Sequence, residues 1–137
     1  MTSYGSGPPR PGALARVSVP VTTDASGDAT AYSEEVTGRV LQMRYVPDGT
    51  SPLDTGADIV VTGDVSGAEI LTQADIGTSA FTAAPRQATH NAVDGTAANY
   101  AATFPVNDYV WVAQERIKVV VANGGNTLSG TFVFYVG

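Results

Sequence analysis

The sequence predicts an all-β protein, an antiparallel β-sandwich or small barrel of about seven or eight short strands. Three observations support this fold class. Apolar and polar residues alternate at period two in several segments, clusters of turn-forming residues separate those segments, and no segment carries an apolar stripe with helical spacing. The length of 137 residues corresponds to a single domain.

The N-terminal segment differs in composition from the rest of the chain. Its beginning reads MTSYGSGPPRPG and contains no apolar stretch like the core of a signal peptide. Pro8, Pro9 and Pro11 fix φ, so this segment is expected to be extended. We therefore divide the chain into an extended arm, residues 1–16, and a single β domain, residues 17–137. The arm is either disordered by itself or ordered on a partner's surface.

Alternation defines the first strand of the β domain. Val17, Val19 and Val21 are separated by less apolar residues, as in a half-buried strand. Because proline lacks an N–H group, Pro20 places this strand at a sheet edge or at a bulge. Turn-forming residues follow at 24–28 and an extended run resumes after them, so a hairpin is expected here.

The middle of the chain alternates between strands and loops. Residues 40–46 are apolar on both faces, which is typical of a central strand, and Pro47 ends it. Residues 48–58 form a loop, and the β-branched run 59–62 is a short strand. The Ala/Thr-rich region 77–99 has few large apolar residues, so we expect a loop that makes contacts with other molecules.

The C-terminal third contains three further strand patterns. They are residues 108–112 (DYVWV), 117–121 (IKVVV) and 130–136 (GTFVFYV). Residues 123–126 (NGGN) tolerate the positive φ angles that hairpin turns require. We therefore expect the last two of these strands to pair as a hairpin.

Composition excludes several classes of function. No cysteine is present, which removes disulfide frameworks, cysteine zinc sites and thiol nucleophiles. The formal charge of −6 argues against nucleic acid as a partner, because that role needs a basic face. No run approaches the roughly 18 apolar residues of a spanning helix, so no membrane partner is expected.

Candidate catalytic and metal-binding residues are few. The single histidine, His90, lies in a polar segment, and no serine is surrounded by a nucleophile elbow. Asp48, Asp54 and Asp58 lie in one loop, where carboxylates either cap turns or hold a cation. Turn capping is the favoured interpretation, and the sequence leaves both open. We expect no enzyme activity, no catalytic residue, no cofactor and no metal ligand.

Four residues are candidates for an interface. Trp111 lies inside an alternating strand, where a tryptophan is either buried or used at an interface, and less often serves as a ligand platform. The other candidates are Arg86, Tyr100 and Phe104, which lie in or close to the region expected to make contacts.

Several phrases of the sequence carry a family resemblance. The chain resembles small virion structural proteins of tailed bacteriophages over roughly residues 17–137. The resemblance is carried by VPVTTDASGDATAY (19–32), GRVL (38–41), DIVVTG (58–63), ERIKVVVANGG (115–125) and SGTF (129–132). These are turn-and-strand phrases, so they indicate a fold group more specifically than a role.

The resemblance implies a capsid decoration (cement) protein. Such a protein would bind the major capsid protein on the outer surface of the head, as a homotrimer, and stabilise the head by bridging neighbouring capsomers. It would be assembled into virions in the host cytoplasm. The extended arm, with Pro8, Pro9, Arg10 and Pro11, would lie along a capsid subunit.

Two alternatives stay open. One is another virion component, a head–tail or tail protein, which the resemblance equally allows. The other is a module that binds carbohydrate or a host surface through residues 77–99 and Trp111.

Overall fold

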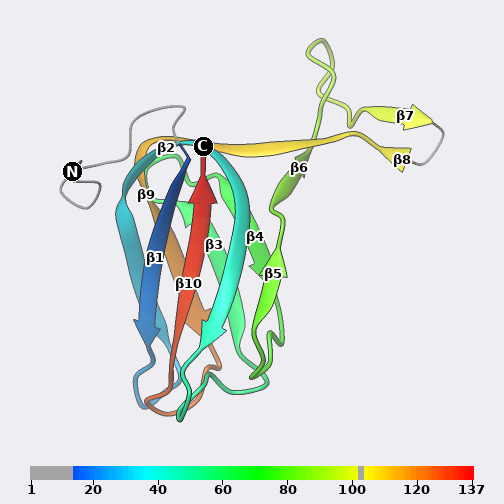
Figure 1. Cartoon of the computed structure of the whole chain (residues 1–137). Helices are drawn as coiled ribbons and strands as arrows, with labels where there is room; N and C mark the ends of the chain where they lie inside the picture. The colour runs from blue at the N-terminus through cyan, green and yellow to red at the C-terminus, as the bar shows by residue number, and fades with distance from the viewer. Residues whose placement is uncertain (1–13, 102–103) are drawn as a thin grey trace.

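The computed structural model describes residues 14–101 and 104–137, and these form an all-β domain without a helix (Figure 1). This confirms the fold class expected from the sequence. The strands are β1 (Ala15–Thr22), β2 (Ala29–Pro47), β3 (Asp58–Gly63), β4 (Glu69–Gln73), β5 (Phe81–Ala83), β6 (Arg86–Ala88), β7 (Asn99–Ala101), β8 (Phe104–Pro105), β9 (Asn107–Ala122) and β10 (Ser129–Val136).

Eight of the described strands belong to one antiparallel sheet that folds around a single core. Its order is β1-β10-β2-β9-β3-β4, with β5 added to β2 and β6 added to β9, while β7 and β8 pair with each other. Side chains from every strand of the main path contribute to one cluster of buried apolar residues, in which Tyr45, Phe132 and Phe134 are the largest. The rings of Tyr45 and Phe132 stack at 5.1 Å between centroids.

The long strand β2 belongs to both halves of the folded sheet. Its first part, from Ala29, pairs with β9, and its second part, from Val40 to Pro47, pairs with β10. Gly38 lies at the corner between them, with a φ of 142° and a register shift before it. Bulges of this kind let a strand bend from one sheet into the next. We call the end of the domain at which β2 turns the crossing end (Figure 1).

A second register shift in β2 changes which side chains face the core. Uninterrupted alternation would put Val40 and Met43 on opposite faces. Between Val40 and Gln42 the pairing with β10 slips by one residue, so that Val40, Met43 and Tyr45 are all fully buried. Apolar residues from both faces of the sequence pattern, Val40 on one and Met43 and Tyr45 on the other, therefore reach one core, and the expectation of a central strand ended by Pro47 is confirmed.

Strand β9 joins two segments that the sequence separates. Residues 108–112 and 117–121 belong to one strand, with Gln114 at a φ of 49° between them. The Gln114 N–H donates to the Thr37 hydroxyl at 2.8 Å, which holds the bulge against β2. Like β2, β9 crosses the end of the domain and then runs the length of the sheet (Figure 1).

Both expected hairpins are wrong, although both turns are present. Strand β1 pairs with β10 rather than β2, and β9 pairs with β2 and β3 rather than β10. Each turn instead connects strands that are not neighbours in the sheet, and the two turns bond to each other. The Thr23 N–H donates to the Leu128 carbonyl at 2.9 Å, and the Gly124 N–H donates to the Gly27 carbonyl at 2.8 Å.

Strand β1 is an edge strand, as Pro20 indicated. Backbone N–H groups along a strand point alternately to one neighbour and to the other. Because the Thr23 N–H points to β10 and donates to Leu128, the nitrogen of Pro20, three residues earlier, points away from β10. The missing N–H therefore leaves the ladder intact and interrupts the row of donors on the open edge. Strand β1 begins at Ala15, inside the expected arm, while Pro8, Pro9, Arg10 and Pro11 lie outside the described residues.

A buried carboxylate holds the turn between β3 and β4. Glu115 is only 5% exposed, and its Oε1 accepts the N–H groups of Val65 at 3.0 Å and Ser66 at 2.9 Å. Burial by itself raises the pKa of Glu115, but bonds from Ser66, Val65 and Ala113 outweigh it and hold that pKa below its usual value. Gly63 has no room for a side chain, because a Cβ there would meet the Glu115 carboxylate.

We expect Gly38→Ala to lower the free energy of unfolding by about 1–3 kcal/mol. A Cβ on Gly38 would lie 3.3 Å from the backbone of Gly137, and its φ is one that L-residues avoid. Gly49→Ala is the matched control, since nothing lies within 4 Å of its Cβ, and it should change stability by less than about 0.5 kcal/mol. Urea unfolding measures both. Equal losses of stability for Gly38→Ala and Gly49→Ala would contradict the requirement for glycine at the corner of β2.

Acid should remove the contribution of Glu115. Because its folded-state pKa is lowered, the carboxylate stabilises the fold above its unfolded pKa of about 4.3, and this contribution is lost as pH falls through the folded pKa. Glu115→Gln should lower the free energy of unfolding by about 1–3 kcal/mol at pH 7. In this variant the free energy of unfolding should also depend less on pH below about pH 4.3. The control is Glu69→Gln, on the exposed side of β4. Parallel profiles for Glu115→Gln and the wild type would contradict this assignment.

Candidate functional site

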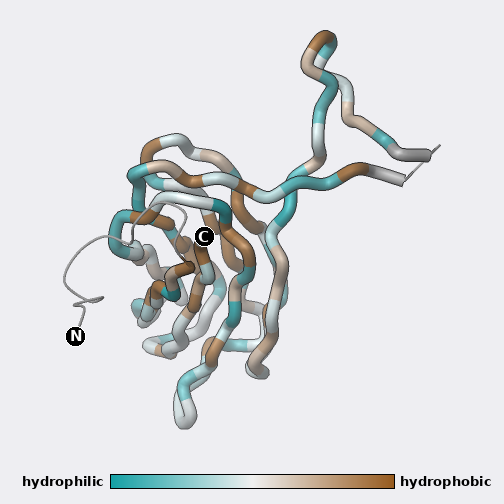
Figure 2. Tube along the Cα trace, turned by 45° about the horizontal axis from the view of Figure 1, so that its top comes forward, coloured by the Kyte–Doolittle hydropathy of each residue, from teal (hydrophilic) through white to brown (hydrophobic). Residues whose placement is uncertain are grey.

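A projecting finger leaves the body of the domain between β6 and β9 (Figure 1). We define it as the described residues between 89 and 106. Three backbone bonds tie its base together. Thr89 donates to Val106 at 2.8 Å, Ala98 donates to Thr89 at 2.7 Å, and Val106 donates to Ala98 at 3.0 Å. Figure 2 shows the finger clear of the folded sheet in a second view.

None of the finger side chains that the structure describes is buried. Residues 91–97 are all exposed, and Val93 is 94% exposed. None of the side chains described between residues 86 and 109 is buried. A two-stranded hairpin is at best marginally stable in water, so this part of the chain depends on backbone bonds or on a surface that covers it.

The finger corrects part of the expectation for residues 77–99. The first part of that region is not loop, because β5 pairs with β2 and β6 pairs with β9 inside the main sheet. Only the part from Thr89 onward projects. The backbones of Tyr100 and Phe104 lie in β7 and β8, while their side chains lie outside what the structure describes.

A platform of four side chains lies beside the base of the finger. Cross-strand pairing sets Arg86 opposite Tyr109 and Arg39 opposite Trp111. The guanidinium carbons of Arg86 and Arg39 lie 4.3 Å and 5.3 Å from the centroid of the Tyr109 ring. Such contacts between guanidinium groups and an aromatic ring hold the charged groups in place. We call these four residues the platform.

Neither arginine of the platform pairs with an Asp or Glu side chain among the described residues. The Arg39 Nε donates to the main-chain oxygen of Gly137, the last residue of the sequence, at 2.9 Å, and Arg86 Nη1 donates to the carbonyls of Pro85 at 2.6 Å and Leu41 at 3.2 Å. Within the described part of the chain, the only salt bridge joins other residues, Arg116 and Asp64. In the described chain, no Asp or Glu side chain therefore neutralises Arg86, which is exposed, or Arg39, which is half-buried.

Trp111 is on the surface and not in the core. Its neighbours Val110 and Val112 are buried, so alternation turns the indole outward, where it is 57% exposed. Of the candidates named from the sequence, the structure brings Trp111 and Arg86 together on the platform. The sequence reasoning missed Arg39 and Tyr109, because only the pairing of β2 and β6 with β9 places them there.

His90 lies in the finger, where its backbone bridges to Ala97. Among the described residues its imidazole has no hydrogen-bond or ion-pair partner, and it is exposed. It therefore takes no part in a Ser–His–Asp arrangement within that part of the chain.

An acidic end lies opposite the crossing end. The turns 23–28, 48–57, 74–80 and 123–128 meet there and contain no lysine or arginine. With the first residue of β3, these turns carry Asp24, Asp28, Asp48, Asp54, Asp58 and Asp75. The turn 123–128 and the start of β10 connect them, since Asp54 N donates to Gly124, Asp48 N donates to Ser129 and Asn123 donates to the Asp58 carboxylate.

The three aspartates considered as cation ligands accept hydrogen bonds from turn residues, Asp48 and Asp54 within their own turn and Asp58 from two other turns. Asp48 accepts the N–H of Ser51 at 2.9 Å and of Thr50 at 3.1 Å, which lowers its pKa. The Asp75 N–H and the Asn123 amide likewise lower the pKa of Asp58. Asp54 accepts its neighbour's N–H. The part of the chain that is described contains no group of three or more potential ligands for a metal ion.

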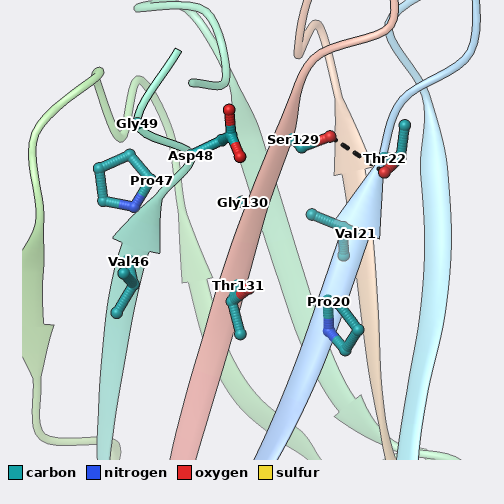
Figure 3. Close-up of a pocket in the computed structure, with 10 residues that line it drawn as sticks. All are labelled: Pro20, Val21, Thr22, Val46, Pro47, Asp48, Gly49, Ser129, Gly130 and Thr131. Atoms are coloured by element: carbon teal, nitrogen blue, oxygen red, sulfur yellow. Dashed lines mark hydrogen bonds between the residues drawn. The ribbon is translucent and has the colours of Figure 1, made fainter. Parts of the chain in front are cut away.

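A shallow hollow of about 370 Å³ lies on the outer face of β1, β10 and β2, near the acidic end (Figure 3). Small side chains on β10 form its floor, and the hydroxyls of Thr22 and Ser129 lie 3.0 Å apart at its edge. Asp48 is the only ionisable residue in the lining. The hollow therefore offers no acid–base or nucleophilic pair.

No family model, curated protein or solved structure matches the chain. In the described residues there is no helix that could cross a bilayer.

Trp111 offers a direct test of the platform geometry. It is the only tryptophan of the chain, so its fluorescence should report a hydrated indole that acrylamide quenches readily. Trp111→Ala should change the free energy of unfolding by less than about 0.5 kcal/mol, whereas Phe134→Ala in the core should cost about 3–5 kcal/mol. A shielded emission, or a large loss of stability for Trp111→Ala, would contradict the exposed placement.

Proposed function

We propose that this chain is a non-enzymatic virion structural protein, a capsid decoration (cement) protein that binds the outer surface of the head. The single observation that carries the proposal is the finger, a β-structured projection in which none of the described side chains is buried. An element of this kind gains stability by lying on another surface. The resemblance of the turn-and-strand phrases to phage virion proteins supplies the identity of that surface.

The proposed mechanism is mechanical. The folded sheet is a rigid body, and the finger reaches from it to the major capsid protein of a neighbouring capsomer. The extended arm, with Pro8, Pro9, Arg10 and Pro11, adds a second contact on the same surface. Alanine and threonine are the commonest residues of the finger, so little side-chain entropy is lost when these positions are covered. Several copies, a trimer in this proposal, would then hold capsomers together without any catalytic residue or cofactor.

Shortening the finger should abolish binding to heads. The test variant replaces residues 91–96 by Asn-Gly, which retains the bridge between His90 and Ala97 and closes the hairpin with a favourable turn. Occupancy on undecorated, expanded heads, measured by cosedimentation and electron microscopy, should fall at least tenfold while thermal unfolding is unchanged. Full occupancy by the shortened variant would contradict the proposed role of the finger.

Removal of residues 1–11 provides a separate test of the arm. The truncated chain should fold, because β1 begins at Ala15, and should lose occupancy on the same heads. Unchanged occupancy would contradict the proposed contact of the arm and leave the finger as the proposed capsid contact. Electron microscopy of intact particles also counts copies, and a few copies at the head–tail junction would favour the alternative of a tail or connector protein.

The exposed indole of Trp111 favours one further candidate, a module that binds carbohydrate or a host surface. Aromatic faces beside polar donors suit the apolar faces of sugars. A glycan array probed with the folded chain tests this function. A blank array would exclude it for the sugars displayed, whereas binding that Trp111→Ala abolishes would support it against the capsid proposal.

A further inference from the structure

The platform and the acidic end are complementary in charge but cannot meet within one molecule. They lie at opposite ends of the sheet, because β10 runs from the acidic end at Ser129 to the crossing end at Val136. Eight residues of extended chain separate the ends by roughly 25 Å. Any contact between the two surfaces is therefore a contact between two molecules.

The platform has the properties of a docking surface. Trp111 is a large exposed aromatic residue, and both arginines are held by backbone carbonyls and the Tyr109 ring, without an Asp or Glu partner in the described chain. Tryptophan, tyrosine and arginine are the residue types that most often dominate binding energy at protein interfaces. Held in place before binding, they lose little conformational entropy when they are covered.

The acidic end matches the platform in chemistry. Its six aspartates are accompanied by no lysine or arginine in the turns that carry them. Its backbone is held by bonds between turns, such as Gly124 to Gly27 at 2.8 Å and Asp54 to Gly124 at 3.0 Å, so the carboxylates are presented on a fixed surface. Arginine binds carboxylates through charge-assisted hydrogen bonds, which are stronger than neutral ones.

We propose that the platform of one molecule docks on the acidic end of a second copy of this chain. The contact is heterologous, because it joins two different surfaces, the platform of one copy and the acidic end of the next. Such contacts close into a ring or continue as a chain, depending on the rotation between copies. This inference does not rest on the proposed function, because the finger and the N-terminal arm remain available for another partner.

Sedimentation velocity at low and high salt is the first measurement. Wild-type protein should associate in a concentration-dependent manner at about 20 mM salt and dissociate at about 500 mM, where exposed charges are screened within a few ångströms. Arg39→Glu combined with Arg86→Glu should weaken the association roughly tenfold or more, because it places carboxylates against carboxylates. Arg44→Glu is the matched control, an exposed arginine on β2 outside the platform, and should associate more strongly than the platform variant.

A mixing experiment tests the direction of the contact. Asp28→Lys combined with Asp54→Lys removes the acidic surface at two positions whose side chains make no bond to another strand. Neither this variant nor the platform variant should associate alone. When mixed, the intact platform of one should bind the intact acidic end of the other, so the mixture should associate although neither variant does so alone.

Several results would overturn the proposal. They are a wild-type protein that is monomeric at low salt and high concentration, an association that salt does not weaken, a platform variant that associates like the wild type, and a mixture that does not associate. Arg86→Glu alone is the fallback variant, because Arg39 also bonds Gly137 and its loss could unfold the crossing end. Thermal unfolding of each variant confirms that the chain is folded before association is measured.

Discussion

The passage of β2 from one half of the sheet to the other is the constraint on which the rest of the structure depends. One strand pairs with β9 along its first part and with β10 along its second, and Gly38 makes the corner with a φ of 142°. Because the strand continues through the corner, both halves share one core and one backbone ladder. A side chain at Gly38 would collide with the chain at Gly137, so the corner also fixes where β10 ends.

The same geometry makes the two ends of the domain chemically different. At the crossing end β2 and β9 pair across the corner, which brings Arg39, Trp111 and the base of the finger to one surface. At the other end only turns remain, and they satisfy their backbone groups by bonding to each other. Short polar residues suit such turns, and aspartate is prominent among them. The way the strands are connected therefore places arginines at the crossing end and aspartates at the opposite end.

Three features of the surface support the two proposals of assembly. In the described part of the chain, the finger has no buried side chain, the arginines of the platform have no Asp or Glu partner, and Asp48 accepts bonds that close its turn. Each of these features gains from a covering surface. The virion role and the contact between copies are separate proposals, because they use different parts of the molecule and fail in different experiments.

Local pattern by itself predicted the fold class and the turn-forming segments 24–28 and 123–126, and it placed β1 at a sheet edge or a bulge, because alternation, Pro20 and Asn/Gly clusters act over a few residues. Tertiary structure alone decided which strands are neighbours. The residues of turn 123–128 are compatible with a hairpin, yet β9 and β10 are not neighbours in the sheet. The backbone groups of this turn instead form hydrogen bonds with turn 23–28. The sequence likewise suggested Arg86 and Trp111, while Arg39 and Tyr109 joined them only through cross-strand pairing. Pairing between distant strands depends on register and bulges, which a local pattern does not specify.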